Sequence, residues 1–281
     1  MARIDALSIE LQTEGKDKLA EEYGKVVENL QHITLSALLK NKDLSGDPTT
    51  GTVEAKRFAN AVGQAYGTAR ANKAGNKVKA DPVVIALNDD TEYMEEVEEK
   101  DLRTYGVNGF IERRTKNHQD SLAVELDTKF FAEAKNAGTE FTPVATDVAD
   151  EIEEAIQKVE TVKNKFVNGV PRNMINVVMA PSYYGKLRNK INAIPNSNGL
   201  GQVANYEAGI FNNTKVYSNV FLPEGVDYIV MVDGAVAQPV MTSISEPAKI
   251  PMSDATSFGL FAYKGTKAVT KDLIFYKSTV A

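Results

Sequence analysis

Residues 122–131 read LAVELDTKFF and form the last part of a segment in which apolar side chains recur every three or four positions. This spacing matches the period of an α-helix, about 3.6 residues per turn, and makes one side of the helix apolar. The apolar stripe contains Ile111, His118, Leu122, Leu126 and Phe130. The charged residues that lie largely off the stripe are Arg113, Arg114, Lys116 and Glu125. The pattern predicts one long helix over residues 107–135, ended by Gly138.

A second amphipathic helix is predicted after the first. Thr146 or Asp147 can cap its free backbone amides, and Gly169 is its natural end. Its apolar stripe contains Val148, Ile152, Ala155, Val159, Val162 and Phe166. A strand is predicted next, over residues 175–179, and Pro181 then opens a short helix that reaches about residue 191. These elements form a strand-turn-helix unit.

Beyond a Gly- and Asn-rich loop at residues 195–201, the sequence predicts mainly strands. They span residues 215–220, 227–232, 236–241, 258–263 and 273–276. Asp233-Gly234, between two apolar runs, is a tight-turn signal, and Lys264-Gly265-Thr266 interrupts the last pair of strands in the same way. Helices and strands together give the fold class α+β.

The chain before the long helix has two contrasting regions. After a short polar arm, residues 16–41 have the periodicity of an amphipathic helix. Residues 52–87 begin as a strand and end in the apolar run 83–87, with glycines and basic residues between. We interpret them as a two-stranded projection with a basic tip, which needs a partner surface because an isolated hairpin is marginal in water. The alternative is a flexible surface loop.

An acidic run at residues 88–101 follows this projection. Its spacing does not fit a calcium-binding EF-hand loop, which needs a Gly at its sixth position and a Glu at its twelfth. A solvated, charge-repelling face is one interpretation, and docking onto a basic patch of a neighbouring copy is the other. In the second case the expected inter-subunit contacts are Arg57, Arg70, Lys73, Lys77, Lys79, Glu95, Glu96, Glu98 and Glu99.

Composition narrows the classes of function. The chain has 281 residues and no cysteine, and the absence of cysteine excludes disulfides and thiolate metal sites. Its net charge of -6 argues against a dedicated nucleic-acid binder, which needs clustered basic residues. No stretch is apolar enough for a membrane span. The two histidines, His32 and His118, fit helix packing or surface positions better than catalysis. We therefore expect no enzyme activity, no cofactor and no catalytic or metal-binding residues.

Five short stretches, taken in order and with their spacing, point to one family. They are GTVE at 51–54, EKDL at 99–102, LD with FF at 126–131, VMAPSYY at 178–184 and FGLFAY at 258–263. With the order of the elements, they make the sequence similar to the major capsid proteins of tailed bacteriophages. The resemblance spans most of the chain, and none of the stretches is a catalytic signature.

The resemblance implies the Hong Kong 97-type fold, with an N-terminal arm, an extended E-loop, a peripheral domain built on a long spine helix, and an axial domain. The corresponding residues are 1–48 for the arm, 49–100 for the E-loop, 101–145 with 242–281 for the peripheral domain, and 146–241 for the axial domain. It further implies a structural protein that assembles with itself into hexamers and pentamers. Their icosahedral shell, the virion capsid, encloses double-stranded DNA without sequence-specific binding and is assembled in the host bacterial cytoplasm.

Two further expectations complete this interpretation. Some relatives carry a scaffolding domain before the E-loop, whereas barely fifty residues precede Gly51 here, so we expect a separate scaffolding protein and a portal as assembly partners. The alternative function is an encapsulin-like shell protein of a bacterial nanocompartment, which would enclose cargo enzymes instead of DNA.

Overall fold

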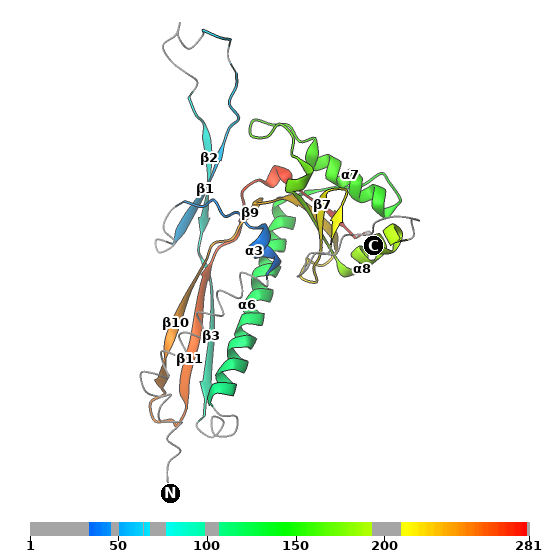
Figure 1. The fold of residues 1–281 in the computed structure, drawn as a ribbon. Coiled ribbons are helices and arrows are strands. Elements are labelled where there is room, and N and C mark those ends of the chain that lie inside the picture. Colours follow the sequence, from blue (N-terminus) through cyan, green and yellow to red (C-terminus); the bar gives the residue numbers. More distant parts are fainter. Residues whose placement is uncertain are drawn as a thin grey trace.

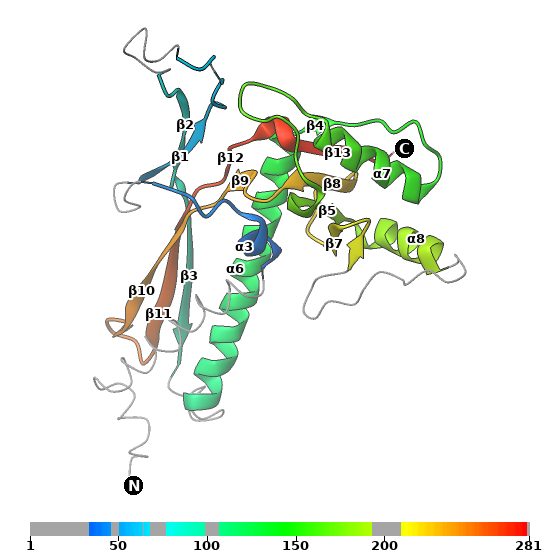
Figure 2. The same ribbon diagram turned by 45° about the horizontal axis from the view of Figure 1, so that its top comes forward.

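The structure is a computed structural model that describes residues 34–45, 51–63, 65–67, 77–98, 107–192 and 209–279. Three parts are arranged around one long helix, α6 (Figure 1). A two-stranded hairpin projects from one end, a narrow three-stranded sheet runs beside the helix, and a compact part with the remaining helices lies on its other side. Figure 2 shows the same arrangement from a second direction.

Helix α6 spans Val107–Ala137, close to the prediction, and Gly138 follows its last residue. A side chain at Gly138 would collide with the carbonyl of Ala134 and the side chain of Ile274, so the chain leaves the helix where it touches the next element most closely. Of the predicted stripe, His118, Leu122, Leu126 and Phe130 are buried, and the side chain of Ile111 lies outside the described residues.

A six-stranded mixed sheet forms the centre of the compact part. Its strand order is β4-β13-β8-β5-β7-β6. The strands are β4 (Thr139–Glu140), β5 (Ile175–Met179), β6 (Ile210–Phe211), β7 (Thr214–Ser218), β8 (Val226–Val232) and β13 (Ile274–Ser278). The four longer strands confirm four of the predicted ones, with ends that differ by one or two residues.

Helices cover both faces of this sheet. On one face, α7 (Val148–Glu160) and α8 (Pro181–Asn192) pack on residues such as Val177 and Val230. On the other face, α6 and the short helix α3 (Leu35–Leu39) pack on their neighbours Val178 and Ile229. Because alternate residues of a strand point to opposite faces, a strand covered on both sides is largely apolar, and β8 has that pattern from Tyr228 to Val232, after Asp227 near its start.

The three-stranded sheet has the order β10-β11-β3, all antiparallel, with β3 (Asp89–Val97), β10 (Val240–Lys249) and β11 (Thr256–Lys264). Strand β11 confirms a prediction. The strand predicted at residues 236–241 is divided into β9 (Val236–Ala237) and β10, because Pro239 has no amide hydrogen to continue the ladder. Strand β9 pairs instead with β12 (Lys267–Ala268).

The projection predicted from residues 52–87 is a two-stranded antiparallel hairpin. Strand β1 (Thr52–Phe58) pairs along its whole length with β2 (Ala80–Ala86). The hairpin rises away from the rest of the molecule (Figure 1). Short 3-10 turns, η2 (Arg172–Met174) and η3 (Lys271–Leu273), precede β5 and β13.

One helix prediction is wrong at its C-terminal end, and another can be compared with the structure only in part. Asp147 caps α7 by accepting a hydrogen bond from the amide of Ala149, as predicted, but the helix ends at Glu160 and does not continue to Gly169. Residues 163–168 form a tight turn, in which the Asn164 side chain accepts hydrogen bonds from two amides that a helix would have used. Of the helix predicted at residues 16–41, residues 16–33 lie outside the described residues, and α3 is the described part.

Candidate interaction surfaces

Strand β3 divides the acidic run between two faces of its sheet. Asp89, Thr91, Tyr93 and Glu95 alternate with the more exposed Asp90, Glu92, Met94 and Glu96. The first set contacts side chains of α6, as the hydrogen bonds below show, and the second set points the other way. The acidic run is therefore a strand with two different sides, and not a uniformly solvated face, because half of its polar groups find partners in the same chain.

Glu125 of α6 is the centre of the polar contacts under β3. It accepts hydrogen bonds from Thr91 and Tyr93, each at 2.9 Å, and pairs with Lys264 of β11 at 2.9 Å. Lys264 is fully buried. Burial alone would raise the pKa of Glu125, but hydrogen bonds from Lys264, Lys129, Thr91 and Tyr93 outweigh it and lower that pKa to about 2. The carboxylate therefore stays charged and holds helix and sheet together.

A second polar contact lies further along the same face. Glu95 forms an ion pair with Arg114 of α6, and its carboxylate is 3.2 Å from Nε2 of the buried His118. Burial, and then the charge of Arg114, lower the pKa of His118. At the other end of β3, Lys129 donates to Asp89 at 2.6 Å. His118 is thus a helix-packing histidine, as the sequence suggested.

The opposite face of the three-stranded sheet carries carboxylates that have no such partners. Asp90, Glu92, Glu96 and Glu98 are exposed, and no described residue forms an ion pair with any of them. Between them lies Met94, whose side chain crosses the opposite residue, Gly259. Residues directly opposite each other in a sheet share a face, so Phe261 and Tyr263 of β11, opposite Glu92 and Asp90, extend this surface. We call it the open sheet face.

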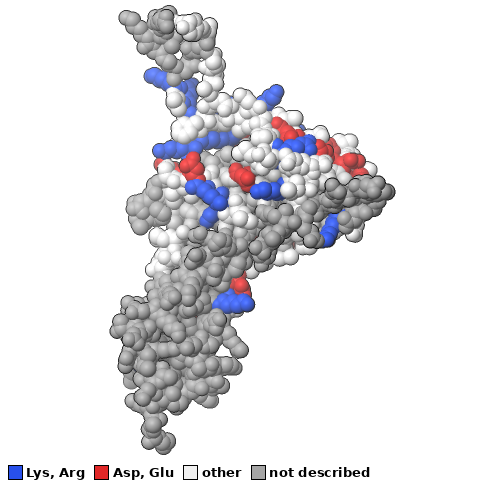
Figure 3. Space-filling view, viewed as in Figure 1, with Lys and Arg blue, Asp and Glu red and all other residues white. Residues whose placement is uncertain are grey.

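The hairpin is both basic and apolar on its surface. Lys56, Lys77 and Lys79 are exposed. The sequence interpretation missed the exposed large apolar residues Phe58, Val62, Tyr66, Val78 and Val84, of which Tyr66 is 96% exposed. The sequence interpretation used the run 83–87 as the end of the projection and did not show which apolar side chains would be exposed. Exposed apolar side chains on a thin projection indicate a contact with another surface. In Figure 3, basic side chains lie on this projection below its undescribed tip.

The nine predicted contact residues fall into three groups: exposed residues, residues with partners in their own chain, and residues outside the described part of the chain. Glu96 and Glu98 lie on or next to the open sheet face, and Lys77 and Lys79 are exposed on the hairpin. Arg57 and Glu95 have partners in their own chain, Asp272 and Arg114. Arg70, Lys73 and Glu99 lie outside the described residues. Contacts between subunits stay a prediction for all nine.

Helix α6 also holds the N-terminal side of the described chain. The carboxylate of Asp127 accepts hydrogen bonds from the backbone amides of Ser36 at 2.9 Å and Leu35 at 3.3 Å, the first residues of α3. One residue earlier, the carbonyl of Leu126 accepts from Gln238 at 2.9 Å. Because successive residues turn by about 100° around a helix, the side chains of Glu125 and Asp127 reach different elements, the three-stranded sheet and α3, and the carbonyl between them reaches Gln238. The stretch LAVELDTKFF at residues 122–131 is thus a junction between elements and not a reaction centre.

The described residues also bear on two other classes of function, metal binding and membrane insertion. Among these residues, no cluster of three or more His, Asp or Glu side chains could hold a metal ion. Likewise, no helix in the described part of the chain is long and apolar enough to cross a membrane.

Comparison with known proteins identifies the fold. No family model and no curated protein matches the sequence. Among solved structures, a chain from the capsid of cyanophage P-SCSP1u superposes with a TM-score of 0.62 at 15% identity, covering 89% of each chain. A chain from the capsid of Ralstonia phage GP4 gives 0.62 at 13% identity, covering 82% of this chain and 84% of that one. The virus-like particle from Pyrococcus furiosus gives 0.58 at 11% identity, covering 93% and 98%. The chain has a phage capsid-like fold of mixed helices and strands, which confirms the predicted α+β class and agrees with the sequence resemblance.

Proposed function

We propose that the protein is the major capsid protein of a tailed bacteriophage. It assembles with itself into hexamers and pentamers, and these build an icosahedral shell around double-stranded DNA, without catalysis. One observation carries the proposal: in a capsid-like fold, an apolar and basic hairpin projects away from the body, and no described element covers an acidic sheet face on the same chain. A chain that exposes two surfaces of complementary charge is suited to bind further copies of itself.

The division into domains belongs to this proposal. The hairpin would be the core of an E-loop at residues 49–100, preceded by an N-terminal arm at 1–48. Residues 101–145 with 242–281 would be the peripheral domain, which contains α6 and most of the three-stranded sheet. Residues 146–241 would be the axial domain, with α7, α8 and most of the six-stranded sheet.

The structure supports a specific contact between copies. Alternate residues of a strand are about 6.6 Å apart, so the outward carboxylates of β3 form a regular row. Lys56, Lys77 and Lys79 of a second hairpin would meet this row, while its apolar side chains would cover Met94 and its neighbours on the open sheet face. Each exposed pair contributes only about 0.2–1 kcal/mol, so assembly depends on the whole row and on the apolar contact.

Charge reversal tests this contact. The triple variant Glu92→Lys, Glu96→Lys and Glu98→Lys should give folded subunits that form no closed shells in electron microscopy and sedimentation. The matched control reverses three other exposed carboxylates, Glu140, Asp150 and Glu224, and should assemble. Adding Lys56→Glu, Lys77→Glu and Lys79→Glu to the first variant should restore shells. Normal particles from the first triple variant would refute the contact.

The contents of the shell decide between two candidate functions. The likeness to the Pyrococcus virus-like particle supports the alternative, an encapsulin-like nanocompartment shell. Nuclease-protected DNA inside native particles would support the phage capsid, and enclosed cargo protein would support the nanocompartment.

A phage capsid located in the virion and assembled in the bacterial cytoplasm would also recruit a portal and a separate scaffolding protein. Co-expression with candidate scaffolding proteins should then change tubes or irregular shells into uniform ones.

A further inference from the structure

The hairpin is attached to the rest of the molecule at two separate places. The first is apolar: Ala55 and Ile85 of the hairpin pack with Ala237 and Val269 in a small buried cluster. Next to it, a side chain at Gly265 would collide with the backbone carbonyl of Ala86, so the end of β2 lies directly on the backbone of the body. Both strands enter the hairpin here, where the amide of Leu87 bonds to the carbonyl of Gly51. We call this attachment the hinge cluster.

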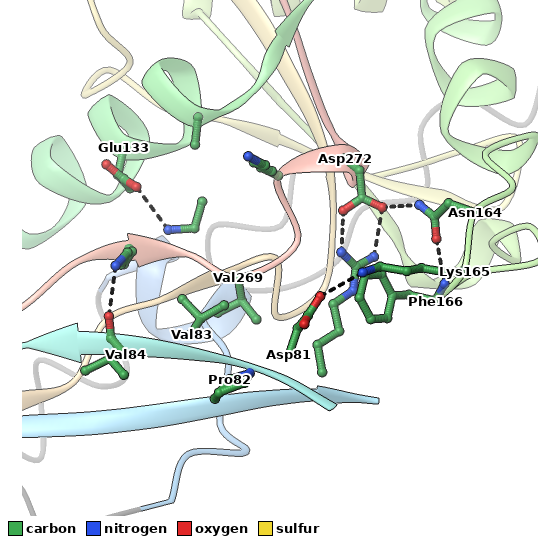
Figure 4. A pocket seen from close by; sticks show the side chains of 15 residues that line it. Asp81, Pro82, Val83, Val84, Glu133, Asn164, Lys165, Phe166, Val269 and Asp272 are labelled. Atoms are coloured by element: carbon green, nitrogen blue, oxygen red, sulfur yellow. Dashed lines mark hydrogen bonds and ion pairs between the residues drawn. The ribbon is translucent and has the colours of Figure 1, made fainter. Parts of the chain in front are cut away.

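The second attachment is polar and lies further out along the hairpin. Arg57 of β1 donates two hydrogen bonds to the carboxylate of Asp272 in η3, at 2.6 and 2.8 Å. The same carboxylate accepts from Asn164, and the Arg57 guanidinium stacks over the Phe166 ring, 4.3 Å from its centre. Figure 4 shows Asp272, Asn164 and Phe166 converging on this point from two segments of the body. We call these four residues the latch.

Two weaker contacts run beside the latch. Lys165 pairs with Asp81 of β2 at 3.0 Å, but both side chains are more than half exposed, so this pair contributes little. The amide of Asn60 donates to the carbonyl of Lys165. Arg57 differs from Lys165 because its side chain is only 15% exposed and its two hydrogen bonds to one carboxylate fix the direction of approach.

Between the two attachments the hairpin is not closely packed on the body, and its contact there includes an exposed hydrogen bond from Nζ of Lys267 to the carbonyl of Val84 at 3.0 Å. A cavity of about 650 Å³ separates them, lined by Pro82, Val83 and Val84 of β2 on one side and by Ala137, Glu133 and Lys271 on the other. Close packing would fix the angle of the hairpin without help. Because this space is unfilled, rotation of the hairpin about the hinge cluster is limited mainly by the polar contacts of the latch.

We propose that the latch of Arg57, Asp272, Asn164 and Phe166 sets the direction in which the hairpin projects, and that opening it lets the hairpin swing about the hinge cluster. This assigns Arg57 an intramolecular role in place of the inter-subunit contact expected from the sequence. The consequence for assembly rests on the proposed function: copies that meet through the hairpin need it held at one angle, and a changed angle changes the curvature of the shell. The swing itself does not depend on that function.

Distances measured within one chain test the proposal. Because the sequence contains no cysteine, Val62→Cys on the hairpin and Ser182→Cys at the start of α8 give two unique sites for spin labels. Labelled chains are diluted with unlabelled chains, and pulsed electron paramagnetic resonance records the distance distribution. The experiment is run in the native sequence and in the charge-reversed triple variant described above, whose subunits are expected to stay unassembled.

The native chain should give one narrow distribution. Arg57→Ala, and independently Asp272→Asn, should broaden it or add a second distance, with unchanged far-ultraviolet circular dichroism. The matched control is Thr52→Ala at the start of β1, whose exposed side chain lies on the opposite side of the strand from Arg57. The exchange Arg57→Asp with Asp272→Arg should narrow the distribution again.

Two outcomes would overturn the latch: an unchanged distribution in both Arg57→Ala and Asp272→Asn, or equal broadening in Thr52→Ala. Failure of the proposed function gives a different result, because a protein that never forms shells can still show latch-dependent distances. If the native distribution depends on Arg57 and no shells form under any condition, the latch stands and the capsid proposal falls.

Discussion

The six-stranded and three-stranded sheets pack against the same helix, but in different ways. Helices cover the first sheet on both faces, and apolar residues such as Phe130 and Phe131 of α6 fill the contact. The second sheet meets α6 largely through hydrogen bonds and ion pairs centred on Glu125, and no described element covers its open face. In the first region, both faces of the sheet are buried within one chain. In the second region, one face of the sheet stays exposed and carries charged and apolar residues, which is why we place the contact between copies there.

Core truncation should affect the first region most. Phe131 is fully buried and meets Phe130 edge to face, with ring centres 5.3 Å apart. Phe131→Ala should lower the free energy of unfolding by about 4 kcal/mol, because it removes a large buried ring and leaves a cavity. Urea unfolding of unassembled subunits measures this loss. Val124→Ala on the same helix, where Val124 is 41% exposed, is the control and should cost less than about 0.5 kcal/mol. Equal losses would contradict the assignment of the core.

The next largest effect should come from the polar contact of the other region. Glu125→Ala leaves the buried Lys264 without its carboxylate, so we expect a loss of about 3 kcal/mol in the free energy of unfolding. Replacing both partners, Glu125→Leu with Lys264→Met, should recover most of it, because no unpaired charge stays buried. Glu92→Ala, on the open face of the same sheet, should have almost no effect. If the double variant is less stable than Glu125→Ala, the ion pair is not the source of the loss.

Acid should weaken the same contact with a defined sign. The pKa of Glu125 in the folded chain is about 2, below the ordinary value of 4.5. Its contribution is therefore complete above pH 4.5 and is lost as the pH falls towards 2, by roughly 2 kcal/mol. Glu153 of α7, hydrogen-bonded by Arg172 and then opposed by burial, has a pKa lowered to about 2 as well and adds acid sensitivity in the compact part.

The paired variant Glu125→Leu with Lys264→Met separates the acid sensitivity that comes from Glu125 from that of Glu153. Its stability, measured by urea unfolding at several pH values, should fall less steeply between pH 4.5 and 2 than that of the native chain. An identical slope would show that Glu125 is not the group responsible.

The smallest effect concerns α3. Asp127→Ala removes the acceptor of two backbone amides at the start of this helix, so we expect a loss of about 1 kcal/mol in the free energy of unfolding. Trypsin should then cleave faster after Lys40 and Lys42, which follow α3. Asp127→Asn keeps one oxygen acceptor and should fall between the native chain and Asp127→Ala. Unchanged cleavage in Asp127→Ala would mean that packing of Leu35 and Leu39 alone holds the helix.

Local patterns in the sequence predicted most of the fold. The period of apolar residues gave α6 within two residues at its C-terminal end, and the Asp147 cap gave the start of α7. The end of α7 was predicted wrongly, because Val162 and Phe166 continue the helical spacing while Asn164 bonds locally to the backbone and turns the chain. Periodicity records which side chains are apolar and does not record competing hydrogen bonds.

The candidate surfaces were harder to predict. In β3, Thr91, Tyr93 and Val97 at alternate positions are the signal of a strand, but the charges between them hid it. For the latch no local signal exists, because Arg57 and Asp272 are 215 residues apart and only the folded chain brings them together. Lys77 and Lys79 are exposed on the projection where the sequence placed them, and their contact with other subunits stays a prediction.

The alternation along β3 has a consequence for how this stretch can change in length. Its two sets of side chains are defined only by odd and even position, so the strand has something like a reading frame of two. Deleting one residue near its start would turn Glu92 and Met94 beneath α6 and Tyr93 and Glu95 outward, while nearly the same amino acids remained. Deleting two would shorten the sheet and keep every side chain on its own side. Insertions and deletions tolerated here should therefore come in pairs.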